Sequence, residues 1–499
     1  MKVLLCHPNQ LVSFDGVKAR PMVGPPLGIL LIAGYLRQAL PDVEIDIYDA
    51  RLSAQSWVDE RGDSIFGDGD AEIRARFQAA APDIIGISNM FSAQVDRAYR
   101  MADLAREACP DARIVFGGPH ASVYPLEAIG RDSIDWAVIG EGEKRFAELV
   151  AALDAGTPVE IQGVVGSPDD MSLLRPNPRA PITFLSPLDD LPLPAYDLID
   201  MDAYFELVRQ GFSPRYREWG SRPISMLTSR GCPHKCVFCS IQTTMGYRFR
   251  FHSFDYVKRH ISHLVDNYGV DFIHFEDDNL VHIPERYDEI VEFLAELEPG
   301  VGWDTPNGVR GDAWTRERVR RARESGCEFL TVAVESAVQR VLDEVIHKRL
   351  DLARVDDMMR YCHDEGLRLH AFYIIGFPGE TLDEIQTTVD YALDRYRRYG
   401  VTPFLQPLIP IPGTDVYKMV AEQGLYEGEL RTQYNQIKTD EFDPEDIQRI
   451  YKSYLRKRLL TFGFRTLTSR RDFVYNTRLV ATYPQAVVHA VKNAIRAAG

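Results

Sequence analysis

Short apolar runs alternate with longer amphipathic stretches over the first 145 residues. The runs KVLLC, VEIDIYDA, PDIIGIS, ARIVFGG and IDWAVIG have the length and composition of buried strands. Between them, residues 27–40, 94–109 and 125–130 have patterns typical of helices. Strands alternating with helices form a parallel sheet covered on both faces. We therefore expect an α/β fold with an N-terminal doubly wound, Rossmann-like domain over residues 1–150.

A second alternating series covers residues 221–415. Its apolar runs are PISMLTS, VDFIHFEDD, VGWDTPNGV, CEFLTVAVES, LRLHAFYIIGFPGE and VTPFLQPLIPIPGT, and helical patterns such as 254–268, 316–325 and 351–365 separate them. Six such units predict a partial or complete TIM-type β/α barrel, in which chemistry lies at the carboxyl ends of the strands.

Two further segments complete the chain. Residues 151–220 are rich in proline and lack a sustained period, which favours an extended linker. Residues 416–499 return to a helical pattern, with an apolar stripe in IQRIYKSYLRKRLL, and predict a small helical C-terminal region.

Composition and charge narrow the classes of function. The chain of 499 residues is 45% hydrophobic and 26% charged, as in soluble globular proteins, and it is too long for one core. Its net charge of -16 repels phosphate backbones, so nucleic acid is not expected as a partner. The apolar run at 25–36 is too short to cross a bilayer, and the N-terminus lacks a signal-peptide pattern. We expect a cytoplasmic protein.

Three of the seven cysteines are grouped in the stretch TSRGCPHKCVFCS, at positions 232, 236 and 239. A structural zinc site needs four ligands, and the next cysteine is Cys327, while His234 lies inside the loop. Three thiolates with one open position suit a four-iron, four-sulfur cluster whose last iron binds a ligand. A zinc loop is the alternative that the residues leave open.

The spacing C-x3-C-x2-C directly after a strand resembles the radical S-adenosylmethionine enzymes. In that superfamily the amino and carboxylate groups of S-adenosylmethionine chelate the unique iron. An electron from the cluster then cleaves S-adenosylmethionine to a 5′-deoxyadenosyl radical. The resemblance implies that Cys232, Cys236 and Cys239 are catalytic residues and the ligands of a 4Fe-4S cluster.

The same resemblance implies a site for S-adenosylmethionine at the ends of the later strands. Its residues are Phe238 and Gly376 near the adenine, Glu276, Asp277 and Arg310 near the amino acid end, and Glu335 with Ser336 at the ribose. Asp278 and Asn279 are alternatives that would line the substrate pocket instead. Taken singly, each carboxylate has a structural alternative as a helix cap or an exposed ion pair.

The N-terminal motifs resemble the cobalamin-binding domain fused to many radical S-adenosylmethionine proteins. The residues that carry this resemblance, and that it implies at the cobalamin site, are Ser88, Met90, Gly117, Gly118, Pro119, His120, Glu141 and Gly142. A flavodoxin-like domain with tight turns is the alternative. The D-x-H-x-x-G signature of other cobalamin proteins is absent, so we expect no histidine on cobalt, with His7 and His120 peripheral.

These resemblances together predict a cobalamin-dependent radical S-adenosylmethionine methyltransferase. It would transfer a methyl group from methylcobalamin to an unactivated carbon after the 5′-deoxyadenosyl radical abstracts hydrogen. A cyclase or ring-rearranging oxidase with the same cofactors is one alternative, and a non-enzymatic corrinoid- or zinc-binding module is another. The expected partners are a small-molecule or lipid substrate and an external electron donor such as flavodoxin or ferredoxin.

The C-terminal region is basic although the chain as a whole is acidic. Residues 447–499 contain eleven Lys or Arg residues and one acid, Asp472. This region is either a peripheral membrane contact or a solvated face that balances the acidic body.

Overall fold

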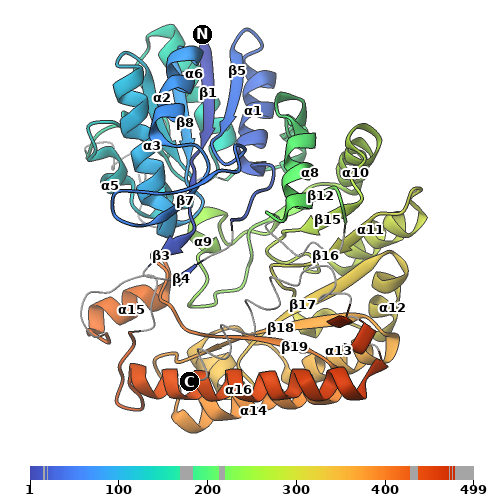
Figure 1. Ribbon diagram of the computed structural model, residues 1–499. Helices are drawn as coiled ribbons and strands as arrows, with labels where there is room; N and C mark the ends of the chain where they lie inside the picture. Colours follow the sequence, from blue (N-terminus) through green and yellow to red (C-terminus); the bar gives the residue numbers. More distant parts are fainter. Residues whose placement is uncertain are drawn as a thin grey trace. The chain divides into compact units, whose positions relative to one another are not determined.

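The computed structural model describes residues 1–14, 17–18, 21–168, 184–212, 220–426, 436–470, 472–474 and 476–477 (Figure 1). The proline-rich part of the expected linker, 169–183, and the basic tail beyond 477 lie outside these ranges. The chain forms two compact units, one of Met1–Cys232 with Ile241–Phe272 and one of Pro233–Ser240 with Ile273–Gly499. The limits of these two units do not coincide with the expected domain boundaries at 150, 220 and 415, and those boundaries stay predictions.

The first unit contains the expected doubly wound sheet. Its strand order is β11-β10-β9-β8-β1-β5, with β11 antiparallel to β10 and the neighbouring pairs from β10 to β5 parallel. The strands are β1 (Lys2–His7), β5 (Glu44–Asp49), β8 (Ile84–Ser88), β9 (Arg113–Gly117), β10 (Trp136–Val138) and β11 (Val164–Val165). The order reverses beside β1, and ligands of such sheets bind at the carboxyl ends of the strands near this reversal.

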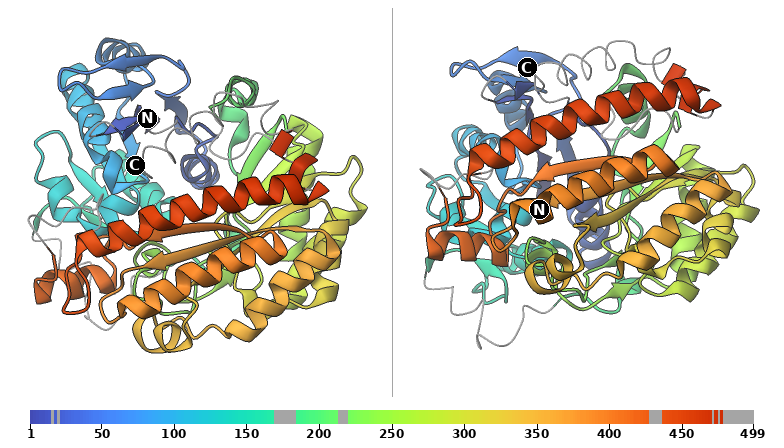
Figure 2. Two further views of the ribbon diagram at one scale, coloured as in Figure 1. Left: turned by 60° about the horizontal axis from the view of Figure 1, so that its bottom comes forward. Right: turned by 90° about the horizontal axis from the view of Figure 1, so that it is seen from below.

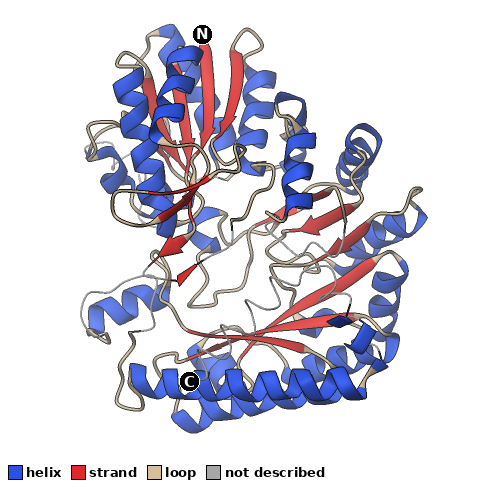
Figure 3. Cartoon of the chain, in the orientation of Figure 1, coloured by secondary structure: helices blue, strands red, loops and turns tan. Residues whose placement is uncertain are grey.

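Helices cover both faces of this sheet (Figure 3). They are α1 (Leu27–Ala39), α2 (Asp70–Ala80), α3 (Val95–Ala108), α4 (Pro119–Val123), α5 (Pro125–Ile129) and α6 (Gly142–Ala155). Leu36 of α1 and Phe146 of α6 share one apolar cluster, whereas Phe77 of α2 and Leu104 of α3 belong to another. The two clusters are the two buried faces that a parallel sheet requires, so this part of the prediction is confirmed.

The expected linker contains a helix, α8 (Met201–Gln210), whose N-terminus is capped by Asp200. Tyr204 and Leu207 of α8 pack with Val12, Val23 and Phe66 of the sheet domain. The Tyr204 hydroxyl also donates to Asp49 at 2.9 Å. This differs from the extended conformation expected for residues 151–220, because a ten-residue helix is too short to show a sustained period beside many prolines.

Several small elements of the first unit have no counterpart in the expected pattern. They are the antiparallel strands β2 (Gln10–Leu11), β6 (Ser56–Val58) and β7 (Ser64–Phe66), the pair β3 (Ser13–Phe14) and β4 (Val17–Lys18), and the pair β13 (Ser229–Arg230) and β14 (Arg250–Phe251). The unit also includes β12 (Pro223–Met226), α9 (Ile241–Thr244) and α10 (Phe254–Tyr268). Strands of two residues are too short to show a period of hydrophobic positions, so the sequence pattern does not predict them.

The second unit is a β/α half-barrel built in sequence order. Its strands are β15 (Phe272–Phe275), β16 (Gly302–Asp304), β17 (Cys327–Glu335), β18 (Arg368–Ile375) and β19 (Thr402–Pro407), and β16 to β19 are parallel neighbours. The intervening helices are α11 (Pro284–Glu296), α12 (Arg316–Glu324), α13 (Leu352–Glu365) and α14 (Leu382–Tyr399), with a π-helical turn at Val341–Val345. The alternation expected for a partial barrel is confirmed.

The described C-terminal region is helical and consists of α15 (Asp415–Gln423) and α16 (Pro444–Thr468). Helix α16 lies along α14 and β19 (Figure 2), and its Tyr454 hydroxyl donates to the Pro403 carbonyl at 2.9 Å. Among the described helices, none combines the length and apolar composition needed to cross a bilayer.

Candidate active site

The carboxyl ends of β8 and β9 form the edge at which cobalamin is expected. Ser88 is the register partner of Gly117, and the Asn89 amide donates to the Gly117 carbonyl at 2.9 Å. At Gly118 φ is +102°, and a Cβ there would lie 2.3 Å from the Asn89 carbonyl oxygen. At Gly117 a Cβ would meet nothing within 4 Å. The edge is therefore closed at Gly118 and open at Gly117, which leaves room for a ligand beside the strand end.

Two large apolar side chains near this edge are exposed to solvent. Met90 and Phe91, which follow β8 and Asn89, are each 53% exposed. Pro119 occupies the first position of α4, so the turn at Gly117 and Gly118 leads directly into that short helix. An exposed methionine and an open glycine suit the flat, largely apolar face of a large ring, as the cobalamin expectation requires.

Of the two histidines near this edge, His120 is buried and His7 is half-buried, and each ring contacts protein groups. The His120 ring contacts the Tyr99 hydroxyl at 3.2 Å through Nε2 and the Ser92 hydroxyl at 3.0 Å through Nδ1. Burial lowers the pKa of His120, and it lowers the pKa of His7 to about 4. Both rings are therefore neutral near pH 7. Both ring nitrogens of His120 already have protein partners, which supports the expectation of a peripheral role.

Glu141 and Gly142 mark the start of α6. The Glu141 carboxylate is buried and accepts from Arg230 at 3.0 Å, from Arg250 at 2.7 Å and from the Leu185 amide at 2.8 Å. At Gly142 a Cβ would lie 3.0 Å from Ile32 of α1. Glu141 thus pairs with protein cations, and its contact with cobalamin stays a prediction.

The three-cysteine loop follows β13. Gly231 has φ +80°, where a Cβ would lie 2.5 Å from the Arg248 carbonyl oxygen, and the Cys232 amide donates to the Gly246 carbonyl at 3.3 Å. Cys232 belongs to the first unit, whereas Cys236 and Cys239 belong to the second, where the Cys239 amide donates to the Cys236 carbonyl at 3.1 Å. Within the described ranges, no group of three or more His, Cys, Asp or Glu side chains has the geometry of a metal site.

The chemistry of these thiols nevertheless fits an iron–sulfur cluster. All seven cysteines lie in described ranges and none forms a disulfide, and the three in the loop are half-buried. Cys6 and Cys327 are buried core residues, and burial raises the pKa of each, which disfavours the thiolate that binds metal. Burial, with the charge of Arg310, lowers the pKa of His234 to about 4. The loop therefore offers three accessible thiols beside a neutral imidazole.

Glu335 is the last residue of β17 and Ser336 follows it, and each has a protein partner. Glu335 has φ +69° and accepts from Lys348 at 2.8 Å, with both side chains buried. The Ser336 and Thr388 hydroxyls are 3.2 Å apart. Lys348 was not identified from the sequence, because it follows Glu335 by thirteen residues in no motif.

The groups expected at the amino acid end of S-adenosylmethionine lie on neighbouring loops of the second unit. Arg310 pairs with Asp312 at 2.6 Å and donates to the Lys348 and Arg349 carbonyls at 3.0 Å each. After β15, the Glu276 carbonyl accepts from Asn307 at 2.7 Å, and Asp277 and Asn279 are buried. The Oδ1 atom of Asn279 is buried without a hydrogen-bond partner among the described residues, as expected of a group that meets a ligand.

Gly376 begins a tight loop after β18 that depends on a carboxylate the sequence did not identify. Gly376 has φ +86°, and its amide and that of Phe377 both donate to Glu380 at 2.8 Å. Burial raises the pKa of Glu380 to about 7. The Phe238 ring lies 5.8 Å from the Phe377 ring. The signal available in the sequence was the glutamate that closes the stretch GFPGE. In the structure this residue, Glu380, is fully buried.

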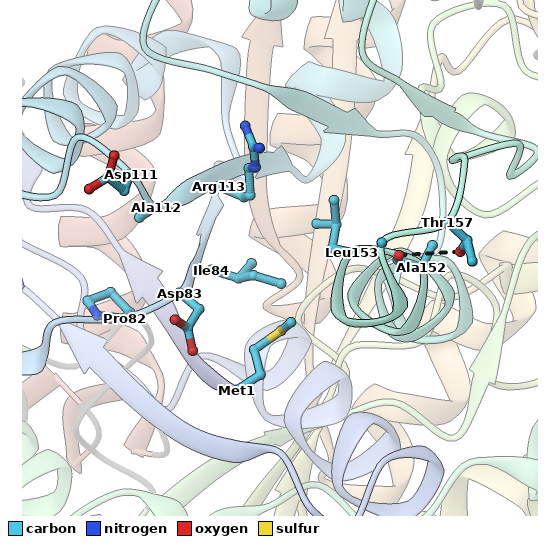
Figure 4. A pocket seen from close by; sticks show the side chains of 11 residues that line it. Met1, Pro82, Asp83, Ile84, Asp111, Ala112, Arg113, Ala152, Leu153 and Thr157 are labelled. Atoms are coloured by element: carbon cyan, nitrogen blue, oxygen red, sulfur yellow. Dashed lines mark hydrogen bonds between the residues drawn. The ribbon is translucent and has the colours of Figure 1, made fainter.

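One surface pocket lies away from all these groups. It measures about 440 Å³ and is lined by Met1, Asp83 and Arg113, where β1, β8 and β9 begin (Figure 4). The strands' other ends carry the candidate cobalamin residues, so this pocket is not part of the site.

Two family models match the chain, the B12 binding domain over residues 16–150 and the radical SAM superfamily over residues 226–392. The fold and these matches define an enzyme whose cofactors are cobalamin, a 4Fe-4S cluster and S-adenosylmethionine.

Curated relatives extend the match over most of the chain. Cytidylyl-2-hydroxyethylphosphonate methyltransferase of Streptomyces wedmorensis is 30% identical over 86% of this chain and 83% of its own length. An uncharacterized methyltransferase of Pyrococcus horikoshii is 30% identical over 95% of this chain and 94% of its own. The anaerobic magnesium-protoporphyrin IX monomethyl ester cyclase of Rubrivivax gelatinosus is 25% identical over 79% of this chain and 66% of its own. The chain belongs to the cobalamin-binding radical S-adenosylmethionine family of methyltransferases and cyclases.

A solved structure agrees on the fold. The cobalamin-dependent S-adenosylmethionine radical enzyme OxsB, with aqua-cobalamin and S-adenosylmethionine bound, superposes with a TM-score of 0.71 at 14% identity. The superposition covers 99% of this chain and 72% of OxsB.

Proposed function

We propose that this enzyme transfers a methyl group to an unactivated carbon of a small organic substrate. The proposal rests on the observation that one chain contains both features of such an enzyme. One is a B12 binding domain whose sheet edge is open at Gly117, and the other is a loop of three accessible cysteines in the radical SAM domain. Methyltransferases at 30% identity over most of the chain support the same reaction class.

The bound cofactors supply the radical and methyl-transfer chemistry, and the chain's residues hold and shield them. Cys232, Cys236 and Cys239 ligate the cluster as thiolates. The open turn at Gly117 and the apolar Met90 receive the cobalamin. Electrons come from a one-electron donor such as flavodoxin or ferredoxin.

S-adenosylmethionine is held by the second unit. The Phe238 ring and the Gly376 loop pack on the adenine, and the loop keeps its shape because Glu380 accepts from two of its amides. Glu335 and Ser336 receive the ribose hydroxyls. Arg310, Glu276 and Asp277 receive the amino acid end, and the buried Oδ1 atom of Asn279 orients the substrate.

Product analysis tests the reaction. Anaerobic enzyme is given a reductant, candidate substrates and S-adenosylmethionine labelled in its methyl group. Methyl transfer predicts label in the product together with 5′-deoxyadenosine and S-adenosylhomocysteine. Deoxyadenosine without label in the product would instead favour ring closure or oxidation, the class to which the Rubrivivax cyclase belongs.

We also propose that α16 contacts an anionic lipid surface. Leu460, Phe464 and Leu467 lie four and three residues apart, on one face of the helix, and are 74%, 54% and 86% exposed. Exposed basic residues, Arg456, Lys457 and Arg470, bracket this stripe at both ends. Apolar side chains flanked by cations complement anionic headgroups over acyl chains. The expected cytoplasmic location stays a prediction.

Co-sedimentation with phosphatidylglycerol vesicles tests this contact. Binding is expected to weaken as salt is added and to be lost in L460Q/F464Q/L467Q. L126Q, which changes an exposed leucine of α5, is the matched control and should bind normally. Absent or salt-insensitive binding contradicts the proposal. Self-association lost in the triple variant would assign the stripe to a second copy, and protection by residues 478–499 would assign it to the chain's own tail.

A further inference from the structure

Four buried charged side chains form one network inside the first unit. Arg230 of β13 donates to Glu141 at 3.0 Å and to Glu143 at 2.6 Å, and Arg250 of β14 donates to Glu141 at 2.7 Å. All four side chains are at most 5% exposed. Glu141 directly precedes α6 of the cobalamin-binding domain and Glu143 lies in its first turn, whereas the two arginines are register partners in the β13–β14 pair.

The network continues through the backbone to the first cysteine of the cluster loop. Arg250 also donates to the Met245 carbonyl at 2.7 Å and to the Leu185 carbonyl at 2.8 Å. The next residue after Met245 is Gly246, whose carbonyl accepts from the Cys232 amide at 3.3 Å. Cys232 is two residues beyond Arg230, and Gly231 between them packs against the Arg248 carbonyl. The position of Cys232 is thus tied to the start of α6.

We infer that Glu143, with Glu141, Arg230 and Arg250, is a positioning device that fixes the backbone entering the cluster loop on the cobalamin-binding domain. Neither acid is needed for chemistry in this role. The inference rests on the proposed function in one respect, namely that Cys232 is a cluster ligand.

Energetics favour a positioning role over simple stabilisation. Two arginines and two acids balance in charge, but burying them costs desolvation energy that apolar residues of similar size would avoid. Burial alone would raise the pKa of Glu143, and the charge of Arg230 reverses this and lowers it, so the acid stays ionised. The network also constrains orientation, because the planar guanidinium groups donate to carboxylates only in a narrow geometry.

Amide hydrogen exchange tests the inference on the cofactor-free chain. In E143Q the amides of residues 229–232 and 246–251 are expected to exchange about tenfold faster than in the unchanged chain, while the amides of β1 and β8 stay protected. Glu143 is the better target because Glu141 is also a cobalamin candidate. D197N, which removes the exposed Arg37–Asp197 pair of the same unit, is the matched control and should change neither segment.

A second measurement separates positioning from folding. With cofactors loaded, E143Q should form about fivefold more 5′-deoxyadenosine per methylated product, because the radical would form while the cluster loop is misplaced on the cobalamin-binding domain. D197N should keep the original ratio. If E143Q does not fold, R230K keeps the charge balance and loses the planar fork, and the same two changes are expected of it. Unchanged exchange in both segments, or an unchanged ratio, overturns the inference. If no methyl product forms with any variant, the proposed function fails and the exchange result still decides this inference.

Discussion

Lys348 donates to Glu335 at 2.8 Å where β17 ends, and both side chains are buried. Glu335 has φ +69°, a conformation that residues other than glycine rarely adopt. The ion pair therefore fixes the one strained carboxylate that we assign to the ribose of S-adenosylmethionine.

Removing Lys348 leaves that carboxylate buried without its cation. K348A is expected to lower the free energy of unfolding by about 3–5 kcal/mol, because an uncompensated buried charge is costly. Urea denaturation measures the loss. K418A removes the exposed Lys418–Asp415 pair and should cost less than about 1 kcal/mol. Equal losses in the two variants would contradict a structural role for the buried pair.

The two glycines after β9 are expected to respond differently to alanine. G118A should destabilise the fold by more than about 1 kcal/mol, since its Cβ would meet the Asn89 carbonyl at 2.3 Å with φ at +102°. G117A meets nothing within 4 Å and should fold normally yet bind cobalamin more weakly. Thermal unfolding and cobalamin titration separate the two effects. Full cobalamin affinity in G117A would remove Gly117 from the site.

Much of the fold could be predicted because its signals are periodic. The helices expected at 27–40 and 94–109 are α1 (Leu27–Ala39) and α3 (Val95–Ala108), and the five short apolar runs of the N-terminal series are parallel strands. Segments without a period were missed. Helix α8 is short and lies among prolines, and β13 and β14 are two residues each.

The residues of the candidate site also fall into those that the sequence predicts and those that it does not. The cysteine triplet and the glycines at strand ends follow from local motifs. The partners of the acids do not, because Lys348, Arg230 and Arg250 are brought to Glu335 and Glu141 by folding alone. Glu141 shows the consequence: its motif indicated a ligand contact, and its carboxylate is paired with two arginines.

Glu380 gives stability a specific pH dependence. Its pKa is raised by burial from 4.5 to about 7, so between these values the folded chain holds a proton that the unfolded chain releases. Stability therefore falls as pH rises through this window, by about 3 kcal/mol at most. E380Q keeps an acceptor for Gly376 and Phe377 but cannot titrate, so its stability relative to the unchanged chain should rise from pH 5 to pH 7.

Urea unfolding at several pH values measures this difference. E422Q, which changes an exposed carboxylate of α15, is the control and should follow the unchanged chain. If E380Q showed the same slope as E422Q, the buried carboxyl would not be the titrating group.

His120 is expected to be structural. H120A should lose about 1–3 kcal/mol of stability, because the buried Tyr99 hydroxyl and the half-buried Ser92 hydroxyl each lose a partner. The electron paramagnetic resonance spectrum of bound cob(II)alamin should show no histidine nitrogen splitting and should be the same in H120A. A splitting that disappears in H120A would instead make His120 a cobalt ligand.

The proposed function requires one chain to hold both a corrinoid and an iron–sulfur cluster, the cluster at Cys232, Cys236 and Cys239. Metal and sulfide analysis of anaerobically purified protein tests this requirement. About four irons and four sulfides with one cobalt per chain are expected, and the triple cysteine-to-alanine variant should lose the iron and sulfide but not the cobalt. Zinc alone, or iron and sulfide retained in that variant, would contradict it.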